Sequence, residues 1–419
     1  MASGPLDGVR VLEFTQIIAG PFGCQNLADM GAEVIKVEPP EGEPWRIFGQ
    51  FMPNESKTFQ SLNRGKKSLV LRMGDERAQK VVHDLIPEID VVVINYRPDV
   101  PARLGIDYET LRAIRPDLIY VDNTAFGREG PWSHRPGYDI VVQAVSGLMA
   151  GEAKVADDGS PAQITSSAMA DYGTGIAIAW GVSAALFHRE RTGEGQLIES
   201  TLLATALAMQ GTQVMSLPPV DAAVRVPMME NIDRMRAAGA SFGELVEAHQ
   251  PWASSIYYRP FATSDGAVAI GALSRGLRDK VRAAFDVDVP DQDDVDLDDP
   301  AIIAQFAAVV PQVEDLVRSK TTAEWMEIFD REGVPGGPVN FAEDMTDDPQ
   351  VVANGLIIDL NHELSGPQQQ VGPILKFSAS PLVPDGASPP LGRDTDEFVG
   401  LAGYSAEQIA ELRAAGVIA

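Results

Sequence analysis

Short apolar runs alternate with helical patterns through the first half of the chain. VRVLEF (9–14) predicts a buried strand, AGPFGCQNLADMGA (19–32) a turn and a helix, and EVIKVE (33–38) a second strand. Further strands are expected at 68–73, 90–96 and 118–124, with a helix at 76–89. Strands that alternate with helices predict an α/β domain built on a mostly parallel sheet.

A long helix is expected from about Tyr172 to Arg191. Asp171 is the expected N-cap residue of this helix, and Gly193 lies near its C-cap. A strand at 196–201 and an apolar helix at 202–214 follow.

The pattern changes beyond residue 215. Residues 218–255 mix Pro, Met and charged residues, and two strand-like pieces, YYRPFAT and AVAIGAL, flank a turn at Ser264-Asp265-Gly266. Helices are expected near 275–285 and 301–330. We therefore predict a smaller α+β domain at about 225–330.

An acidic segment, DVDVPDQDDVDLDD (286–299), contains eight Asp residues. It lacks the Gly and the terminal Glu of a calcium-binding loop. A solvated acidic loop is the better interpretation.

The net charge limits the classes of partner. There are 33 Lys and Arg against 60 Asp and Glu, which gives a formal charge of −27. A surface this acidic repels polyanions on average, so neither nucleic acid nor an anionic membrane is an expected partner. A local cationic pocket for a small anionic ligand remains compatible with this charge.

Cysteine and hydropathy indicate the compartment. With Cys24 as the only cysteine, no disulfide can form within the chain, which fits a cytoplasmic location. We expect neither a signal peptide nor an uninterrupted apolar stretch of transmembrane length. One Cys and five scattered His give no metal-ligand motif.

The first glycine-rich turn could be mistaken for a dinucleotide-binding fingerprint. Its sequence is Ala19-Gly20-Pro21-Phe22-Gly23, which does not match G-x-G-x-x-G, and Pro21 lacks a backbone N–H that could bind phosphate. Glu38 ends the second strand where a ribose-binding acid would lie, but this alone is weak. The glycines are expected to allow close packing of the helix, with room for a ligand over the turn.

Several segments together resemble the family III CoA-transferases, which include formyl-CoA:oxalate and carnitine CoA-transferases and the related α-methylacyl-CoA racemases. These segments, in the family's order, are 5–46, 62–73, 90–121, 130–147, 170–201, GVPGGPVN (333–340) and PPLGRDTDEFV (389–399). The resemblance implies a Rossmann-like large domain built from both chain ends, a small inserted domain, and two interlocked subunits in a homodimer. The large domain would comprise 1–215, with 335–419 returning to it.

Within SSAMADYGTG, Asp171 matches the family's catalytic aspartate. A CoA-transferase needs a carboxylate that attacks a thioester, forms a mixed anhydride and then carries CoA as an aspartyl thioester. Gly173 and Gly175 would let the thioester approach and leave backbone N–H groups for an oxyanion. The helix N-terminus would favour the charged carboxylate. Local sequence alone favours a capping role for Asp171, whereas the family context favours the nucleophile.

Tyr138 bears on the choice between transferase and racemase. In Gly137-Tyr138-Asp139, Tyr138 occupies the place of a His in the racemase relatives, whose reaction needs two acid/base groups. A phenol is a poor proton shuttle near neutral pH because the reference pKa of tyrosine is about 10. Transfer is therefore favoured, although His134 lies close enough in sequence to leave a racemase role open.

The resemblance also implies a binding site for CoA, which acts as a substrate and not as a tightly bound cofactor. Phosphates and an adenine call for cationic groups and flat apolar surfaces. The matching positions are Ile17, Ile18, Ala19, Leu71, Arg72, Met73, Asn95, Tyr96, Arg97, Arg103, Arg135 and Tyr138. Several of them follow predicted strands, where ligands of open α/β sheets bind.

The acyl group is less well defined. Ile18 stands where the formyl-CoA transferase has Gln, and HQPWASSIYYRPF (249–261) lacks that enzyme's glycine run, so an oxalate-specific site is not expected. A different and larger acid could contact Trp252, Tyr257 or Met residues, although such aromatics are more often core. We predict an acyl-CoA:carboxylate CoA-transferase; the alternatives are an acyl-CoA racemase or a catalytically idle acyl-CoA-binding protein. The donor, the acceptor and the role of 218–300 stay open.

Overall fold

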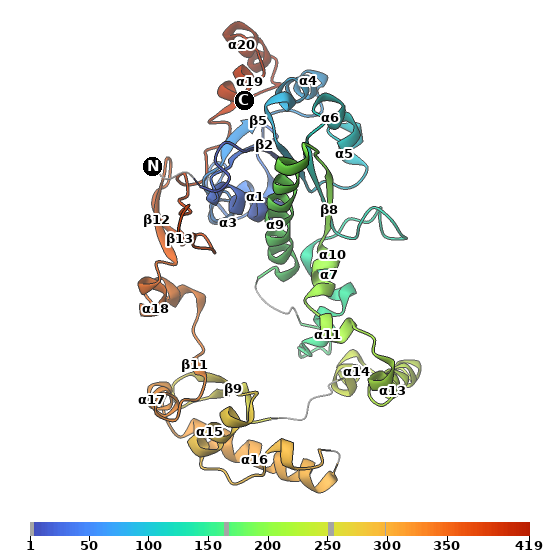
Figure 1. The fold of residues 1–419 in the computed structure, drawn as a ribbon, viewed down its shortest axis with the longest axis vertical. Helices are drawn as coiled ribbons and strands as arrows, with labels where there is room; N and C mark the ends of the chain where they lie inside the picture. The colour runs from blue at the N-terminus through green and yellow to red at the C-terminus, as the bar shows by residue number, and fades with distance from the viewer. Residues whose placement is uncertain (1–3, 163–166, 250–254, 298) are drawn as a thin grey trace. The chain divides into compact units, whose positions relative to one another are not determined.

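The computed structural model describes residues 4–162, 167–249, 255–297 and 299–419. The chain forms two compact units (Figure 1). The large unit comprises Met1–Val226 and Asn354–Ala419, and the small unit comprises Pro227–Ala353.

A six-stranded parallel sheet organises the large unit. Its order is β5 (Lys67–Val70), β2 (Glu33–Glu38), β1 (Arg10–Phe14), β6 (Val91–Ile94), β7 (Ile119–Thr124) and β8 (Leu197–Thr201). Every neighbouring pair is parallel. The chain winds outward in one direction from β1 to β5 and then in the other from β6 to β8. This doubly wound order opens a crevice between β1 and β6 at the carboxyl ends of the strands.

Alternate side chains of each strand pack on opposite faces of the sheet. Val11 faces α1 (Ala19–Asp29) and α9 (Met169–Thr192), whereas Leu12 and Phe14 face the other helical layer. That layer contains α4 (Glu76–Leu85), α6 (Tyr108–Ile114), α19 (Thr395–Leu401) and α20 (Ala406–Ala414). The expected α/β architecture with a parallel sheet is confirmed.

The end of the chain packs beside the edge strand β5. Leu71 forms an antiparallel bridge with Ile418, and Figure 1 shows α19 and the C-terminus near β5. The strand expected at 68–73 therefore ends at Val70, because the backbone beyond it pairs with the C-terminal segment.

Shorter elements complete the large unit. They are α2 (Pro44–Ile47), β3 (Gln50–Met52), β4 (Glu55–Ser56), α3 (Lys57–Leu62), η1 (Ile86–Glu88), α5 (Val100–Arg103), α7 (Asp139–Ser146), α8 (Leu148–Gly151), α10 (Leu202–Ala208), α11 (Gly211–Val214), α12 (Pro218–Asp221) and the hairpin β12 (Ile357–His362) and β13 (Gly366–Val371). Helix α13 (Arg225–Ala237) begins at the boundary. A small apolar cluster joins α7, α8 and α10 to the start of α9, and so holds the helices around Asp171 together.

The small unit has a three-stranded antiparallel sheet. Its strands are β9 (Tyr258–Ala262), β10 (Ala267–Gly271) and β11 (Gly336–Pro338), and its other elements are α14 (Phe242–His249), α15 (Arg275–Phe285), η2 (Gln292–Asp294), α16 (Pro300–Arg318), α17 (Thr322–Glu332), η3 (Ala342–Thr346) and α18 (Pro349–Ala353). Trp325, Phe285 and Phe329 form its aromatic centre. The chain returns to the large unit at Asn354, later than the expected residue 335, because β11 pairs with β10.

The described part of the acidic segment, 286–297 and 299, is only partly solvated, which corrects the expectation of a solvated loop. Asp291 is buried, and its carboxylate accepts hydrogen bonds from Arg278 at 2.7 and 3.0 Å and from Arg282 at 2.9 Å. The pattern of acids concealed this role because the arginines lie on the preceding helix.

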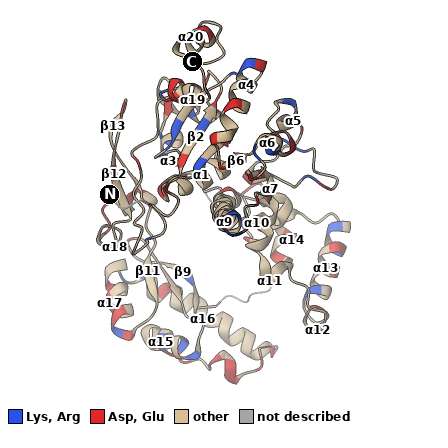
Figure 2. Ribbon diagram, turned by 45° about the horizontal axis from the view of Figure 1, so that its top comes forward, with Lys and Arg blue, Asp and Glu red and all other residues tan. Residues whose placement is uncertain are grey.

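One helix among the described ranges, α16, is long and apolar enough by length and composition to cross a membrane. Most of its length carries no charge, as Figure 2 shows, since its charged residues are Glu314, Asp315 and Arg318. The helix continues through Pro311, and one side of its second half packs into the core of the small unit through residues such as Val313. The average hydropathy is weak evidence for a membrane span, because a core helix passes the same test.

Candidate active site

A cavity of about 310 Å³ lies at the crevice between β1 and β6. Its walls come from the segments that follow β1 and β6, from the end of β7 and the residues after it, from the segment that leads into α7, and from the first turns of α9 and α10. Because these strands are parallel, their carboxyl ends bring together segments that are far apart in sequence. This is the place where an open α/β sheet binds its ligand.

Asp171 lines this cavity from the first turn of α9. The N-cap residue is Ala168, so the prediction that Asp171 caps the helix is wrong; the helix begins at Met169. The Asp171 residue is 8% exposed. Burial, with a further contribution from the nearby Asp139 carboxylate, raises its pKa from 3.8 to about 7. The two effects together outweigh the helix N-terminus, which was expected to favour the charged carboxylate.

Asp139 is a site residue that the sequence analysis missed. Its Oδ1 accepts hydrogen bonds from the backbone N–H groups of Ala170, at 2.8 Å, and of Asp171, at 3.1 Å. Gln143, one turn later on α7, donates to Asp139 Oδ2 and is fully buried. An Asp at the start of α7 and one in the first turn of α9 were visible in the sequence, but their contact is a tertiary one.

Gly173 and Gly175 serve helix packing, which corrects their expected role at an oxyanion site. A Cβ atom on Gly173 would lie 2.4 Å from Met209 Cε, and one on Gly175 would lie 2.9 Å from the Ala19 carbonyl oxygen. Both residues are inside α9, where backbone N–H groups bond along the helix. The glycines bring α10 and α1 close to the helix that carries Asp171.

The glycines of the first turn, Gly20 and Gly23, also allow close packing. A Cβ on Gly20 would overlap Thr15, and one on Gly23 would lie 2.9 Å from Ile178 of α9. Gly20 therefore packs against the end of β1, as expected, whereas Gly23 packs against a helix.

Ile17 holds an unusual backbone conformation at the edge of the cavity. Its φ angle is 72°, which is strongly disfavoured for a β-branched residue. Two contacts stabilise this segment: the Ile17 N–H donates to Glu43 Oε2 at 2.9 Å, and the Asn95 amide bonds both the N–H and the carbonyl of Gln16. Strain of this kind persists only where the surroundings impose it.

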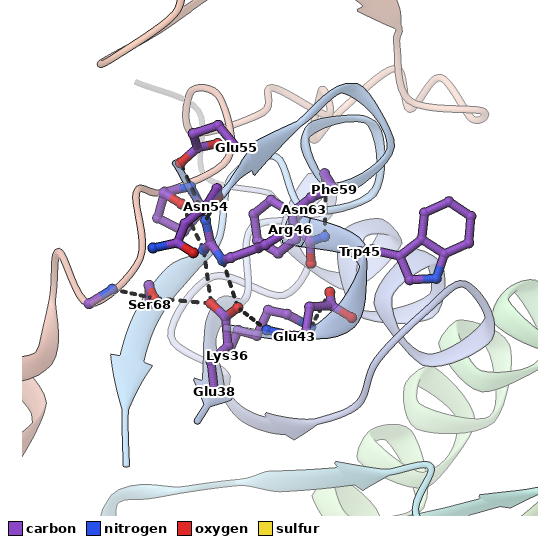
Figure 3. A network of polar contacts seen from close by, with 12 residues as sticks. Lys36, Glu38, Glu43, Trp45, Arg46, Asn54, Glu55, Phe59, Asn63 and Ser68 are labelled. Atoms are coloured by element: carbon purple, nitrogen blue, oxygen red, sulfur yellow. Dashed lines mark hydrogen bonds and ion pairs between the residues drawn. The ribbon is translucent and has the colours of Figure 1, made fainter. Parts of the chain in front are cut away.

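A buried ion network lies beneath this segment (Figure 3). Lys36 is fully buried and lies 3.1 Å from Glu13 Oε1 and 3.2 Å from Glu43 Oε1. Burial opposes the charge of Lys36, but the surrounding carboxylates hold its pKa well above the usual range. The network thus ties β1 and β2 to the residue that holds Ile17.

The Glu38 carboxylate, a candidate to bind a ribose, instead accepts hydrogen bonds from other residues of the protein. Its carboxylate accepts two hydrogen bonds from Arg46, at 2.7 and 2.9 Å, and one from Ser68. Figure 3 shows Arg46 between Glu38 and Glu55, with the Phe59 ring 3.6 Å from its guanidinium carbon. Glu38 is fully committed to this network.

Most residues of the expected CoA site line the cavity, but four do not. Lining residues are Ile17, Ile18, Ala19, Asn95, Tyr96, Arg97, Arg135 and Tyr138. Leu71, Arg72, Met73 and Arg103 lie outside its wall. Leu71 and Met73 pack with the large core, Arg72 donates to the Gly416 carbonyl, and exposed Arg103 lies 3.7 Å from Asp99. Pairing with the C-terminal segment could not be read from the strand pattern.

Other candidates lie away from the cavity. His134 is exposed and does not line it, and Tyr257 is buried in the core of the small unit. Trp252 lies outside the described residues. Within the described ranges, no group of three or more His, Cys, Asp or Glu is placed to hold a metal ion.

A family model described as CoA-transferase family III matches residues 6–395. The chain belongs to CoA-transferase family III. The resemblance read from the sequence is thereby confirmed, and the protein is an enzyme of this family.

Its relatives support the same assignment. The chain is 33% identical over 417 residues to "Succinyl-CoA:glutarate CoA-transferase" of Mus musculus, covering 99% of this chain and 90% of the relative. It is 31% identical over 361 residues to "Acetyl-CoA:oxalate CoA-transferase" of Acetobacter aceti, covering 85% and 86%. The crystal structure of a CaiB/BaiF family protein from Brucella suis has a TM-score of 0.73 at 29% identity, covering 96% of this chain and all of that one.

Proposed function

We propose that this CoA-transferase moves CoA between carboxylic acids through a covalent intermediate on Asp171. The observation that carries the proposal is the environment of this carboxylate. It is buried at the crevice of the sheet, and within the described residues no side chain donates a hydrogen bond or ion pair to it. A carboxylate left without a partner in a ligand cavity costs stability, and such a cost is typical of a reactive group.

The reaction proceeds in four displacements at acyl carbons. An Asp171 oxygen attacks the donor thioester carbonyl, and CoA thiolate leaves as the mixed anhydride forms. The thiolate attacks the Asp171 acyl carbon and releases the donor acid, which leaves an aspartyl-CoA thioester. The acceptor carboxylate then attacks this thioester, and the released thiolate attacks the acceptor acyl carbon. The new acyl-CoA departs and the Asp171 carboxylate is restored.

The cavity suits the reacting end of the substrate. Its volume of about 310 Å³ is near the lower limit for ligand pockets. We therefore place the thioester inside the cavity and the nucleotide outside. Exposed Arg97 and Arg135 at its wall are the candidates for the CoA phosphates, and Arg135 also stacks over Trp132 at 4.4 Å.

A short dicarboxylate is the proposed acceptor. Glutarate and oxalate, named for two of the relatives, are both dicarboxylic acids. We favour a glutarate-sized acid because the wall beside Asp171 presents apolar side chains of Ile18 and Leu202, and Ile18 stands where an oxalate enzyme has Gln.

The two alternatives have less support. Tyr138 lines the cavity, while His134 does not, so no histidine within the cavity wall could shuttle an α-proton. A protein that only binds acyl-CoA would not need a buried carboxyl group with a raised pKa at Asp171.

We also propose a homodimer for this chain. Ile176, Trp180 and Phe187 form an exposed apolar stripe along α9, with Trp180 74% exposed. Beside it lies an apolar groove of about 280 Å³ that includes Ile374 and Phe377. An exposed apolar stripe beside an apolar groove is typical of an interaction surface, and a second copy of the chain is the proposed occupant. Interlocking of the copies and a cytoplasmic location stay predictions.

The test supplies purified protein with succinyl-CoA and glutarate, acetate or oxalate, and follows new acyl-CoA by chromatography in deuterated water. Formation of glutaryl-CoA without deuterium at the α-carbon supports the proposal. Deuterium incorporation without transfer would establish the racemase, and binding without either reaction would establish the idle protein.

A further inference from the structure

Asp139 and Gln143 form a buried polar pair. Neither residue takes part in the transfer steps described above. Asp139 is 7% exposed and Gln143 is fully buried, and both lie on α7 rather than on the helix that carries the nucleophile. Buried polar groups of this kind cost free energy unless they are bonded. The bonds of this pair lead directly to Asp171.

The start of α9 lacks a cap of its own. The first N–H groups of a helix have no partners within it, and Ala168, at the N-cap, has no side chain that could accept a hydrogen bond. Asp139 Oδ1 fills this role from outside the helix by accepting from Ala170 N–H and Asp171 N–H. The second of these bonds is made by the nucleophile's own backbone.

We propose that Asp139 is a positioning residue for the nucleophile: it caps α9 from α7 and holds the Asp171 backbone so that its side chain faces the cavity. Gln143 keeps Asp139 in place by donating to its other oxygen. This inference rests on the proposed function of Asp171.

The charge of Asp139 has a second consequence. It adds to the rise in the pKa of Asp171 that burial causes. The other ionisable groups around the nucleophile are Tyr172 on its own helix and, in the cavity wall, Tyr96, Arg97, Arg135 and Tyr138. Among the described residues, helices α1 and α10 contribute Ala19 and Leu202 to that wall, and neither side chain is ionisable. Asp139 is the acidic neighbour whose removal should change the ionisation of Asp171.

Asp139→Asn separates the two effects. The Asn oxygen can still cap α9, and its new N–H₂ group would face Gln143. The Gln143 Oε1 atom has no hydrogen-bond partner in the described structure. If the Gln143 amide rotates by half a turn, this oxygen accepts a hydrogen bond from the new N–H₂ group. The geometry is therefore kept while the charge is lost. Asp139→Ala removes the charge and the cap together.

The experiment measures kcat and KM from pH 5 to 9 with succinyl-CoA and glutarate. For Asp139→Asn we expect the acid limb of kcat/KM to move down by about half a pH unit or more. For Asp139→Ala we expect kcat to fall roughly tenfold while the KM for succinyl-CoA stays within about twofold. Gln143→Leu should give a smaller fall in kcat. This variant tests the same contact if Asp139→Ala does not fold.

Asp107→Ala is the matched control, because Asp107 caps α6 by accepting from Thr110 N–H at 3.1 Å. It should lower the melting temperature without changing the acid limb or kcat. An unmoved acid limb in Asp139→Asn, or an equal loss of kcat in Asp107→Ala, would overturn the inference. Transfer by Asp171→Ala would instead overturn the proposed function, so the two failures are distinguishable.

Discussion

Asp171 in the large unit and Asp291 in the small unit are both buried, but their surroundings differ. Asp291 accepts hydrogen bonds from Arg278 and Arg282, and the Arg278 bonds hold its pKa well below the usual range. Asp171 faces another carboxylate and a cavity, and burial raises its pKa to about 7. The first arrangement stabilises a charge, whereas the second keeps a carboxylate reactive. Burial alone therefore does not identify a catalytic acid; the partners do.

The largest expected effect is on chemistry. Asp171→Ala should lower transfer by at least about a thousandfold, because Asp171 is the one carboxylic acid among the described residues that line the cavity, and only a carboxyl group can carry CoA as an acyl thioester. CoA should still bind, since the arginines of the cavity wall remain, and isothermal titration with CoA checks this. Substantial transfer by the variant would remove Asp171 from the mechanism.

The pH dependence of the wild-type enzyme should reflect the same carboxylate. Only ionised Asp171 attacks a thioester, and its pKa is about 7. Below this value kcat/KM should fall about tenfold per pH unit. A pH profile with saturating acceptor tests this, and a flat profile down to pH 5 would show that Asp171 ionises as an ordinary aspartate.

Breaking the small unit's ion pair should cost stability without an effect on chemistry at Asp171. Arg278 and Asp291 have side chains only 4% and 1% exposed. Arg278→Leu should destabilise the fold by about 3 kcal/mol, at the low end for buried pairs because Arg282 still contacts Asp291. Denaturant unfolding measures this. Arg275→Leu, which breaks an exposed pair with Asp294, is the control and should have little effect.

Replacing the reactive carboxylate should stabilise the protein, in contrast to the change at Arg278. Because the folded-state pKa of Asp171 is raised, the folded chain binds more protons than the unfolded chain between about pH 4 and 7, and its stability falls as pH rises through that window. Asp171→Asn does not ionise there. At pH 8 the free energy of unfolding of this variant should be about 2 kcal/mol higher than that of the wild type. This is roughly half of the free energy that a shift of three pKa units represents. Near pH 4 the two proteins should be equally stable. Thermal melts at both values decide, and equal stability at pH 8 would contradict the raised pKa.

Local patterns predicted five strands of the sheet, β1, β2, β5, β6 and β7, because each is a short and mostly buried run, whereas β8, which was also expected, is only half-buried. The turn between β9 and β10 and the C-cap at Gly193, with φ of 76°, were also readable from residue type. The start of α9 was not, because its cap comes from Asp139 on another helix. Leu71 and Arg72 were misplaced for the same reason, since the residues they contact lie at the far end of the chain. Motifs identified Asp171, while its ionisation depends on tertiary contacts.

The most direct test of the account is to trap the enzyme's covalent intermediate. The protein is incubated with succinyl-CoA, treated with hydroxylamine or borohydride, digested, and analysed by peptide mass spectrometry. We predict a hydroxamate or a reduced side chain on the peptide containing Asp171, and none in Asp171→Asn. A modification at another residue, with Asp171 unmodified while transfer proceeds, would contradict it.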